Sequence, residues 1–437
     1  MRDTGASTPG QSPILPEGHL ATAVRLLARL AAESSPSDDA RALRSMAAIL
    51  AAELAARGLS VEVHDEPDEH GSPLPVVFAT SSGEGLAASA PLLLIGHFDT
   101  VLAAAAPRLD AGCLFATGAI DMKGGIVAFL AALDLLAARN VSPPPLRLVL
   151  VPDEEVGGAI SRRAVAREGA AAAALWVLEP GERRGRGETL VTGRRGMFHW
   201  RLRVHGRAAH SGLAYWQGRS ALLAAAEWSA RAASLSRSPD GATVNVARLA
   251  AGESRSVTIL VGRSGDVQPN AAAATFGTGY QLNVVPDLAL VEGETRFLRA
   301  AEGPLLEREL AALAKEIAAR HEVTVEFSAH GTIAPVDPAN LPPDLADRAV
   351  TLAAAAGWEL VREPDRGGIS FPNFLPEPGR IPVLDGLGPV GGGMHTREEF
   401  VELESLARRI RLLGDLLEAE TLAAAERAGQ RGALSAS

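Results

Sequence analysis

The chain has 437 residues, 47% of them hydrophobic and 4% aromatic, which is typical of a globular protein with two domains or one large α/β body carrying an insertion. The formal net charge of −10, with no concentrated basic stripe, argues against binding to nucleic acid or to an anionic membrane surface. Cys113 is the only cysteine, which excludes an intrachain disulfide and a multi-cysteine zinc site.

The N-terminal segment predicts a loose tail without a targeting signal. Residues 1–19 are rich in Ser, Thr, Pro and Gly, and no apolar stretch follows a basic start. No predominantly apolar, uncharged run reaches the roughly 18 residues that a membrane span needs. We therefore expect a cytoplasmic protein, with a second flexible tail over residues 426–437.

The first half of the chain alternates helical and strand patterns. Two helices are expected between Leu20 and Gly58, the second with Ser37 as its capping residue. The runs SVEVHDE, PLLLIGHFDTV and LRLVLVPDEE read as strands, and Lys123 to Asn140 reads as a helix. This alternation predicts an α/β fold with a mostly parallel sheet covered by helices.

Near Val191 the rhythm changes to the order βαββαβ, which predicts an inserted α+β domain, ferredoxin-like in its order, over residues 192–330. Its expected elements are the strand Met197–His205, the helix Gly218–Ser236, the strands Thr243–Leu249 and Leu288–Leu298, the helix Pro304–Arg320 and the strand Glu322–Phe327. The stretch from 251 to 280 contains one strand-like run, SVTILV, whose purpose does not follow from the sequence. The α/β pattern returns after residue 330 and ends in a helix from Glu399 to Ala425.

Polar residues with metal-binding chemistry follow several of the buried strands, where an open α/β sheet collects its ligands. They are His97 and Asp99 in GHFDT, Asp121 in GAIDMKGG, Glu154 and Glu155 in PDEEVGG, Glu179 in WVLEPG, and His395 in GPVGGGMHT. Any one of them is more often structural than a ligand. Together they form a histidine and carboxylate set suited to zinc, manganese or cobalt in a hydrolytic site. Two ions about 3.5–4 Å apart would leave room for a bridging water whose pKa they lower.

The motifs HFDTV, DMKGG, DEEVG, LEP, GRAAHSG, NVVPD and GLGPVGGGMHT, in this order, resemble those of a zinc peptidase and deacylase family. That family includes acetylornithine deacetylase, succinyl-diaminopimelate desuccinylase, aminoacylase and bacterial glutamate carboxypeptidase, and the likeness is greatest to the last branch. It extends from about Leu20 to Ala425. The resemblance implies a discontinuous catalytic, metal-binding domain over 20–191 and 331–425, and a lid and dimerisation domain over 192–330.

The resemblance also implies a role for each residue of the set. Asp121 would bridge two Zn²⁺ ions, for which Co²⁺ or Mn²⁺ can substitute, with Glu155 and His395 completing one ion's ligands and His97 and Glu179 the other's. Asp99 would accept the N–H of the His97 ring, unless it is only a turn former before Thr100. Glu154 would be the general base that takes a proton from the metal-bridging water, unless the acidic pair is a solvated helix start.

Three residues of the inserted domain match substrate-binding positions of the family. His210 would reach the active site of a neighbouring subunit and polarise the scissile carbonyl, which implies a homodimer. Asn283 and Arg296 would hold the free carboxylate of the substrate, for which the guanidinium fork of arginine is suited. The simpler alternatives are a loop histidine with local hydrogen bonds and a salt-bridge partner on a strand.

One position departs from the family pattern, because RGGISFPN has Phe371 where the family has an aspartate, and this indicates a more apolar substrate pocket. The predicted function is hydrolysis of an amide or peptide bond beside a free carboxylate, with a small peptide or N-acyl amino acid as substrate. The sequence does not decide between a carboxypeptidase and an N-acyl-amino-acid deacylase. The alternative class is a relative that binds a peptide-like ligand without turnover, but none of the ligands and neither glutamate is missing.

Overall fold

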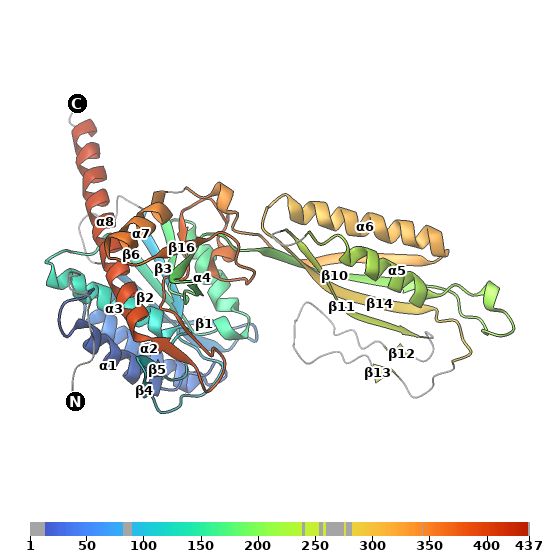
Figure 1. Ribbon diagram of the computed structural model, residues 1–437, viewed down its shortest axis with the longest axis horizontal. Helices are drawn as coiled ribbons and strands as arrows, with labels where there is room; N and C mark the ends of the chain where they lie inside the picture. Colours follow the sequence, from blue (N-terminus) through green and yellow to red (C-terminus); the bar gives the residue numbers. More distant parts are fainter. Residues whose placement is uncertain are drawn as a thin grey trace. The chain divides into compact units, whose positions relative to one another are not determined.

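The computed structural model describes residues 14–81, 90–237, 241–252, 257–258, 275–276, 282–342 and 344–435. The chain divides into two compact units (Figure 1). The larger unit comprises Met1–Gly193, Pro338–Arg366 and Ser370–Ser437, and the smaller unit comprises Arg194–Asp337 and Gly367–Ile369. The smaller unit is therefore inserted into the sequence of the larger one, and it extends beyond residue 330 because its last strand continues to Ile333.

The larger unit is built on a six-stranded sheet with the order β1-β2-β6-β3-β7-β17. These strands are β1 (Leu59–Pro67), β2 (Pro73–Ser81), β6 (Leu146–Val151), β3 (Leu92–His97), β7 (Ala174–Val177) and β17 (Val383–Leu384). The strands from β6 to β17 are parallel, whereas β1 and β2 add antiparallel pairs at one side. Every residue of β3 is buried, as expected for a parallel strand covered on both faces.

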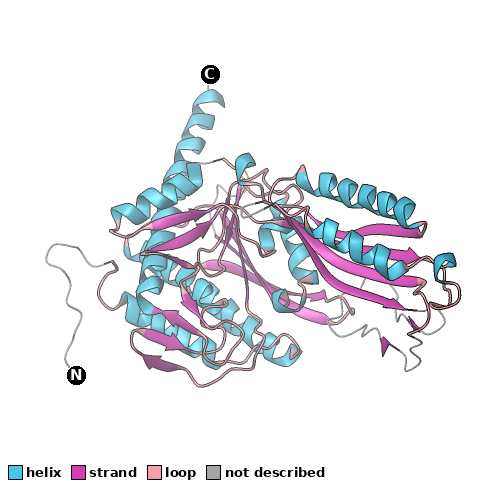
Figure 2. Ribbon diagram, turned by 45° about the vertical axis from the view of Figure 1, so that its right-hand side comes forward, coloured by secondary structure: helices cyan, strands magenta, loops and turns pink. Residues whose placement is uncertain are grey.

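Helices cover this sheet (Figure 2). They are α1 (His19–Ala32), α2 (Ala40–Ala55), α3 (Lys123–Ala138), α4 (Ala159–Gly169), α7 (Asp344–Ala355) and α8 (Leu403–Ser435). Helix α3 is almost entirely buried and contacts both α1 and α8, while α2 packs on β1 and β2. In the described part of the chain, no helix is both long and apolar enough to cross a membrane.

Short elements complete the larger unit and carry several polar loops. One small sheet joins β16 (Leu360–Glu363), β9 (Gly187–Val191) and β8 (Arg183–Arg184). A second joins β18 (Gly391–Gly392), β19 (Phe400–Glu402), β5 (Cys113–Phe115) and β4 (Arg108–Asp110). The 3-10 helices are η2 (Glu154–Val156), η4 (Pro338–Asn340) and η5 (Phe371–Phe374).

Two helix ends of the larger unit differ from the sequence-based expectation. Helix α2 is capped by Asp39, whose carboxylate accepts the N–H groups of Arg41 and Ala42, and not by Ser37. Helix α8 begins at Leu403 and continues to Ser435, through most of the segment expected to be a flexible tail. Most of the N-terminal tail expected over residues 1–19 lies outside the described residues, but α1 already begins at His19.

The smaller unit follows the predicted order βαββαβ. Its sheet has the order β11-β14-β10-β15, with β10 (Gly196–His205), β11 (Thr243–Gly252), β14 (Leu288–Phe297) and β15 (Thr324–Ile333), all paired antiparallel. Helices α5 (Ala221–Ala233) and α6 (Glu302–His321) pack on this sheet. The unit also contains η3 (Tyr215–Gln217) and a two-residue pairing of β12 (Val257–Thr258) with β13 (Thr275–Phe276). The rest of SVTILV lies outside the described residues.

The two faces of this sheet differ because side chains alternate along a strand. On β10, Trp200 is buried and meets Trp228 of α5 edge-on, with ring centroids 5.1 Å apart. On the other face of the sheet, Arg201 pairs across the strands with Glu292 at 2.7 Å, and Arg248 pairs with the same carboxylate at 3.1 Å. One face therefore forms the core of the unit and the other carries cross-strand ion pairs.

Candidate metal centre

The predicted metal-binding residues of the larger unit lie where parallel strands end. His97 is the last residue of β3, and Asp99 follows it closely. Glu154 and Glu155 form η2 just after β6, and Glu179 follows β7. Because β6, β3 and β7 are neighbours in the sheet, their carboxyl ends present these side chains at one edge.

The other two members of the set come from loops. Asp121 stands in the turn that leads into α3, and His395 lies between β18 and β19 with a positive φ of 63°. The carboxylate of Asp121 faces both imidazoles: Oδ1 is 3.1 Å from Nε2 of His97, and Oδ2 is 3.3 Å from Nε2 of His395. Nε2 of His395 is also 3.2 Å from Oε2 of Glu155, and Nε2 of His97 is 3.9 Å from Oε1 of Glu179.

These side chains fit a site for divalent cations. His97, Asp121 and Glu155 offer ligand atoms that all lie within 4.8 Å of one another, and so do His97, Glu154 and Glu179. The donors are imidazole nitrogens and carboxylate oxygens, the set that zinc, manganese and cobalt accept. Cys113, the one thiol, belongs to neither group. The arrangement could therefore hold cations beside His97 and between the two histidines.

The pKa values of the cluster reflect the crowding of carboxylates around two imidazoles. Burial is the largest cause of the raised pKa of Glu155, which lies at about 7; the charge of Asp121 also raises this pKa, and the two histidines oppose the rise. Burial and the charge of Asp121 also raise the pKa of Glu179 well above its usual value. The hydrogen bond to Asp121 raises the pKa of His395 to about 9. Carboxylates held this close repel one another, and a bound cation would relieve that repulsion.

The central pair of the cluster shows opposite shifts. Burial alone would raise the pKa of Asp121, but the hydrogen bonds to His395 and His97 lower it below its usual value. Burial alone would lower the pKa of His97, but the hydrogen bonds to Asp121 and Asp99 raise it well above its usual value. The surrounding groups therefore favour an ionised Asp121 carboxylate next to positively charged groups.

Asp99 holds several parts of the site together. Its Oδ1 lies 3.2 Å from Nδ1 of His97, and its main-chain carbonyl lies 3.1 Å from the same nitrogen. A proton on Nδ1 is therefore held by Asp99, which leaves Nε2 of His97 to face Asp121. The Asp99 carboxylate also accepts the backbone N–H groups of Glu154 and Glu155, both at 3.2 Å, and the hydroxyl of Ser37 at 2.8 Å. Asp99 thus orients the histidine and fixes the start of η2.

Sequence reasoning missed three buried polar residues beside the cluster. The carboxylate of Glu399 accepts backbone N–H groups of the turn that carries Asp121. Asp153 accepts the N–H groups of Ile160 and Ser161 at the start of α4. Nζ of Lys123 donates to the carbonyls of Leu30 and Glu33 at the end of α1. In the sequence, Lys123 lies within DMKGG, Asp153 within DEEVG, and Glu399 four residues after His395. Charge at such a position does not by itself separate structural groups from solvent-exposed ones.

Phe371 is buried at the start of η5, and its ring centroid lies 6.5 Å from that of His97. The same segment is ordered by Ser370 and Asn373, which form a capping box. The aromatic ring therefore brings an apolar surface toward His97 where a carboxylate would bring charge. This agrees with the apolar character that the sequence indicates for this position.

The three remaining predicted residues belong to the smaller unit. Nδ1 of His210 accepts the N–H groups of Gly212 at 3.1 Å and Leu213 at 3.2 Å, and Nε2 lies 3.2 Å from Nδ2 of Asn283. The structure thus brings His210 and Asn283 together.

Arg296 has different neighbours within the same unit. Its guanidinium forms a two-pronged ion pair with Glu294, both contacts at 3.2 Å, and donates to the carbonyl of Gly367 at 3.2 Å. This pairing is the strand-face ion pair expected as the alternative to substrate binding.

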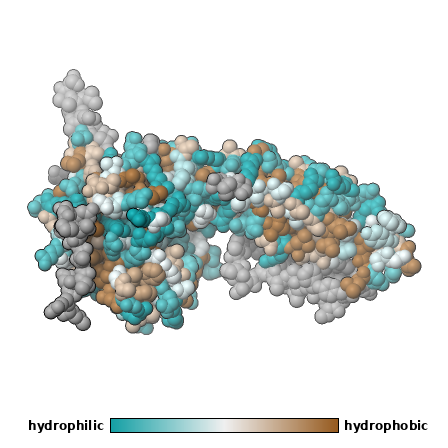
Figure 3. All heavy atoms as spheres, viewed as in Figure 1, coloured by the Kyte–Doolittle hydropathy of each residue, from teal (hydrophilic) through white to brown (hydrophobic). Residues whose placement is uncertain are grey.

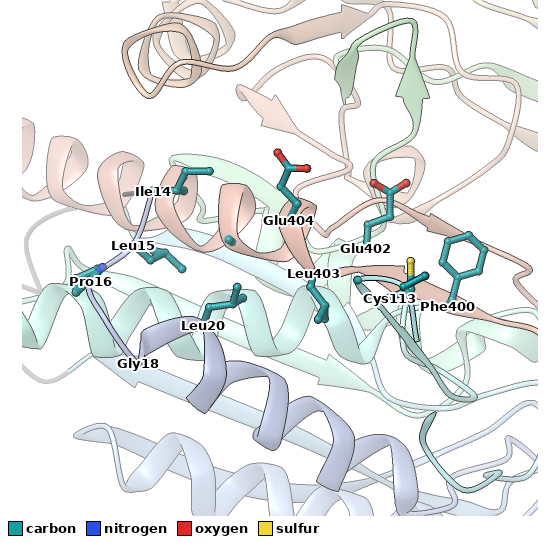
Figure 4. A pocket seen from close by; sticks show the side chains of 13 residues that line it. Ile14, Leu15, Pro16, Gly18, Leu20, Cys113, Phe400, Glu402, Leu403 and Glu404 are labelled. Carbon is teal, nitrogen blue, oxygen red and sulfur yellow. The ribbon is translucent and has the colours of Figure 1, made fainter. Parts of the chain in front are cut away.

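A separate cavity of about 650 Å³ lies elsewhere on the larger unit, between the segment before α1, the turn from β4 to β5 and the start of α8 (Figure 4). Apolar side chains such as Leu15, Leu20 and Leu403 line it. Its carboxylates, Glu402 and Glu404, pair with Arg183 and Arg408. None of the metal-binding candidates lines this cavity. The volume of a cavity therefore does not identify the candidate metal centre in this protein.

Comparison with known proteins gives consistent matches. A sequence model of peptidase family M20/M25/M40 matches residues 93–419. Carboxypeptidase G2 of Pseudomonas sp. (strain RS-16) is 27% identical over 334 residues, 75% of this chain and 73% of that protein. The succinyl-diaminopimelate desuccinylase of Stenotrophomonas maltophilia (strain K279a) is 29% identical over 337 residues, 72% of this chain and 80% of that protein. The desuccinylase of Halorhodospira halophila is 38% identical over 109 residues, which span only 24% of this chain and 29% of that protein.

Solved structures share the fold at low sequence identity. Aminopeptidase PepT from Bacillus cereus superposes with a TM-score of 0.71 at 19% identity, over 92% of this chain and 99% of that chain. The M20 family metallo-carboxypeptidase Sso-CP2 from Sulfolobus solfataricus superposes with a TM-score of 0.61 at 16% identity, over 92% and 99%. The predicted α/β fold with an inserted α+β domain and the predicted family resemblance are both confirmed. Because the family's sequence model matches most of the chain, this protein is a metallohydrolase that belongs to peptidase family M20/M25/M40.

Proposed function

We propose that this metallohydrolase cleaves an amide or peptide bond beside a free carboxylate, as a carboxypeptidase does, with two zinc ions and Glu154 as general base. The observation that carries the proposal is the carboxylate of Asp121, which turns one oxygen toward each of two histidines. A carboxylate placed in this way can bridge two ions. Co²⁺ and Mn²⁺ bind the same donor types and are expected to substitute for Zn²⁺.

The proposed ligands divide into two groups around Asp121. Glu155 and His395, in contact at 3.2 Å, would complete the ligands of one ion. His97 and Glu179, whose nearest atoms are 3.9 Å apart, would complete those of the second. Bound ions would lower the pKa of the attacking water and stabilise negative charge that develops on the substrate carbonyl.

Glu154 is proposed as the residue that moves the proton. It neighbours Glu155 in η2, and its carboxylate lies in the group formed with His97 and Glu179. Asp99 holds the backbone of both glutamates, so the position of Glu154 relative to the cluster is fixed. From there its carboxylate would take a proton from the attacking water and deliver it to the departing amine.

His210 is proposed to donate a hydrogen bond to the oxyanion. Its Nδ1 accepts two backbone N–H groups, so a neutral ring carries its proton on Nε2. An Nε2–H group is the donor that a developing oxyanion requires. Nδ2 of Asn283 lies 3.2 Å from this nitrogen. Because Nδ2 is itself a donor, the amide must turn its oxygen toward an Nε2–H group, and from there Asn283 would contact the same substrate.

Arg296 is proposed to bind the free carboxylate of the substrate together with Asn283. The proposal rests on the geometry of its guanidinium, whose fork suits a carboxylate and which is paired with Glu294 when no substrate is bound. A substrate carboxylate would have to compete with Glu294, and this competition would limit the affinity for substrate.

A homodimer formed through the smaller unit completes the proposal, with each His210 serving the site of the other chain. Among the described strands of its sheet, β11 lies at one edge, where a second copy can add strands. Beside it, α5 exposes Leu222 and Leu223, the latter 54% accessible, and hydrophobic residues gather over this helix (Figure 3). An apolar helix face next to an open strand edge is a self-complementary surface for a two-fold dimer.

Deacylation of an N-acyl amino acid remains the second candidate reaction, because it needs the same ions, base and carboxylate contacts. The apolar Phe371 beside His97 distinguishes this site from one with the family's usual aspartate and favours substrates with an apolar group near the cluster. Membership of a metallohydrolase family argues against the alternative of a ligand binder without turnover. The cytoplasmic location stays a prediction from the sequence.

The deciding experiment is a panel of dipeptides and N-acyl amino acids, each also as its C-terminal amide, assayed with zinc, cobalt or manganese. We expect turnover that depends on metal and on the carboxylate. Preference for dipeptides would select the carboxypeptidase, and preference for N-acyl amino acids the deacylase. Equal turnover of acids and amides would refute the proposed substrate class, and metal-independent turnover would refute the proposed centre.

A further inference from the structure

Glu399 is a buried carboxylate that supports the turn carrying Asp121. It lies on the larger unit and is only 3% exposed. Its Oε2 accepts the backbone N–H of Gly118 at 2.8 Å, and its Oε1 accepts those of Ile120 at 3.0 Å and Asp121 at 3.1 Å. Hydrogen bonds to an ionised carboxylate are stronger than those between neutral groups, so this turn is held firmly.

The same residue belongs to the loop that carries His395. That loop joins β18 to β19, and Glu399 stands at its return, directly before β19. The carbonyl of Glu399 accepts the N–H of Ala116, next to the Asp121 turn, at 3.0 Å. Glu399 therefore connects the two loops through its side chain and through its main chain.

The connection matters because the two loops present the facing groups of the cluster. His395 has a positive φ, a backbone conformation that persists only when the surrounding structure holds it. Its Nε2 lies 3.3 Å from Oδ2 of Asp121. A small shift of either loop would change this separation, and a metal site depends on its ligands being held within a few tenths of an ångström.

We infer that Glu399 is a positioning residue, which sets the placement of the Asp121 carboxylate relative to His395 and thereby the affinity of the cluster for metal. The inference rests on the proposed metal centre and assigns no contact between Glu399 and an ion. Residues that support metal ligands in this way typically contribute about 10–100-fold to metal affinity.

The competing explanation is that Glu399 only stabilises the fold, as any satisfied buried carboxylate does. Glu188 of the larger unit provides the matched comparison. It is fully buried, and its carboxylate accepts hydrogen bonds from Ser405 at 2.9 Å, Arg409 at 2.9 Å and Arg408 at 3.2 Å. None of these partners is a candidate metal ligand or belongs to the Asp121 turn or to the loop between β18 and β19, although Ser405 also accepts the N–H of Val390 before β18. Glu188→Gln therefore removes a buried charge without removing a hydrogen bond made by either loop.

The test substitution is Glu399→Gln, which keeps the shape of the side chain. An amide nitrogen cannot accept a hydrogen bond, so whichever way the amide turns, at least one of the three N–H groups faces another donor. We expect the metal-free variant to bind Zn²⁺ about 10–100-fold more weakly than the wild type in a competition titration against a chelator. The absorption spectrum of bound Co²⁺ should also change, because the spectrum reports ligand geometry.

The thermal stability of both metal-free variants separates the two explanations. We expect Glu188→Gln to lower the melting temperature but to bind Zn²⁺ within about twofold of the wild type, inside the scatter of such titrations. Unchanged zinc affinity and an unchanged cobalt spectrum in Glu399→Gln would overturn the inference. So would a loss of affinity that follows the loss of stability equally in both variants.

If Glu399→Gln does not fold, Glu399→Asp takes its place, because the shorter carboxylate keeps its charge but does not reach all three N–H groups, and the same loss of affinity is expected. Wild-type protein that binds no Zn²⁺ would overturn the proposed metal centre itself, whereas normal wild-type binding with unaffected variants would overturn only the role of Glu399.

Discussion

Removal of the Asp121 side chain tests the bridging geometry most directly, because each of its oxygens faces one histidine. In Asp121→Ala, both proposed ions lose one of three protein ligands and the negative charge that they share. In His395→Ala, only one ion loses a ligand, and the set of His97, Glu179 and Asp121 stays complete. The structure therefore predicts unequal losses from two single substitutions.

We expect about two zinc ions per chain in the wild type, about none in Asp121→Ala and about one in His395→Ala, as a shared bridging ligand requires. The loss of a direct ligand should exceed the 10–100-fold that supporting residues contribute, so Asp121→Ala should weaken zinc binding by more than about 100-fold. Elemental analysis of protein dialysed against a fixed zinc concentration measures the ion count, and a chelator competition gives the affinity. Circular dichroism checks that each variant is folded.

Asp337→Ala serves as the control, since this buried aspartate pairs with Arg299 in the smaller unit and should leave the ion count unchanged. A folded Asp121→Ala protein with its full complement of zinc would refute the bridging role. Equal ion counts in Asp121→Ala and His395→Ala would show that the two histidines do not belong to separate ions.

Three further predictions concern catalysis and assembly. Glu154→Gln should keep its metal content and fold but lose about 10²–10⁴-fold in kcat, because the proton acceptor is gone, and near-normal turnover would remove Glu154 from that role. Arg296→Ala should mainly raise KM and reduce the preference for substrates with a free carboxylate over their amides, and a preserved preference would assign the carboxylate to another residue. His210→Ala and Glu154→Ala should each be nearly inactive alone, whereas equal amounts unfolded and refolded together should recover about a quarter of the wild-type activity per chain, since about half the dimers are mixed and each has one intact site. Verified mixed dimers without activity would show that His210 does not act across the interface.

Much of the fold could be predicted from local sequence patterns. Strand β3 is an apolar run that ends in His97, and β6 is an apolar run, interrupted only by Arg147, that ends shortly before Glu154. The sequence alone therefore indicates both strands and the polar residues at their ends. The order βαββαβ of the smaller unit follows from the periodicity of each segment. The metal-binding candidates were predictable because their residue types and their places after strands are local features.

Element ends and side-chain partners depended on contacts that are distant in sequence. Ser37 is suited to cap a helix, but its hydroxyl donates to Asp99, and Asp39 caps α2 instead. The pattern of α8 weakens after Ala425, yet the helix continues to Ser435. A local rule gives the preference of a residue, and competing tertiary contacts decide which preference is satisfied.

The sequence by itself determined the fold class, the inserted unit and the residue types available for metal chemistry, because these depend on periodicity and composition along the chain. Only the tertiary structure decided that Asp121 turns one oxygen toward each histidine, that Asp99 holds the backbone of η2, and that Glu399 ties the Asp121 turn to the His395 loop. It also gave Arg296 the partner Glu294. The physical reason is that hydrogen bonds and electrostatic contacts depend on distances of a few ångströms between segments that the fold, and not the sequence order, brings together.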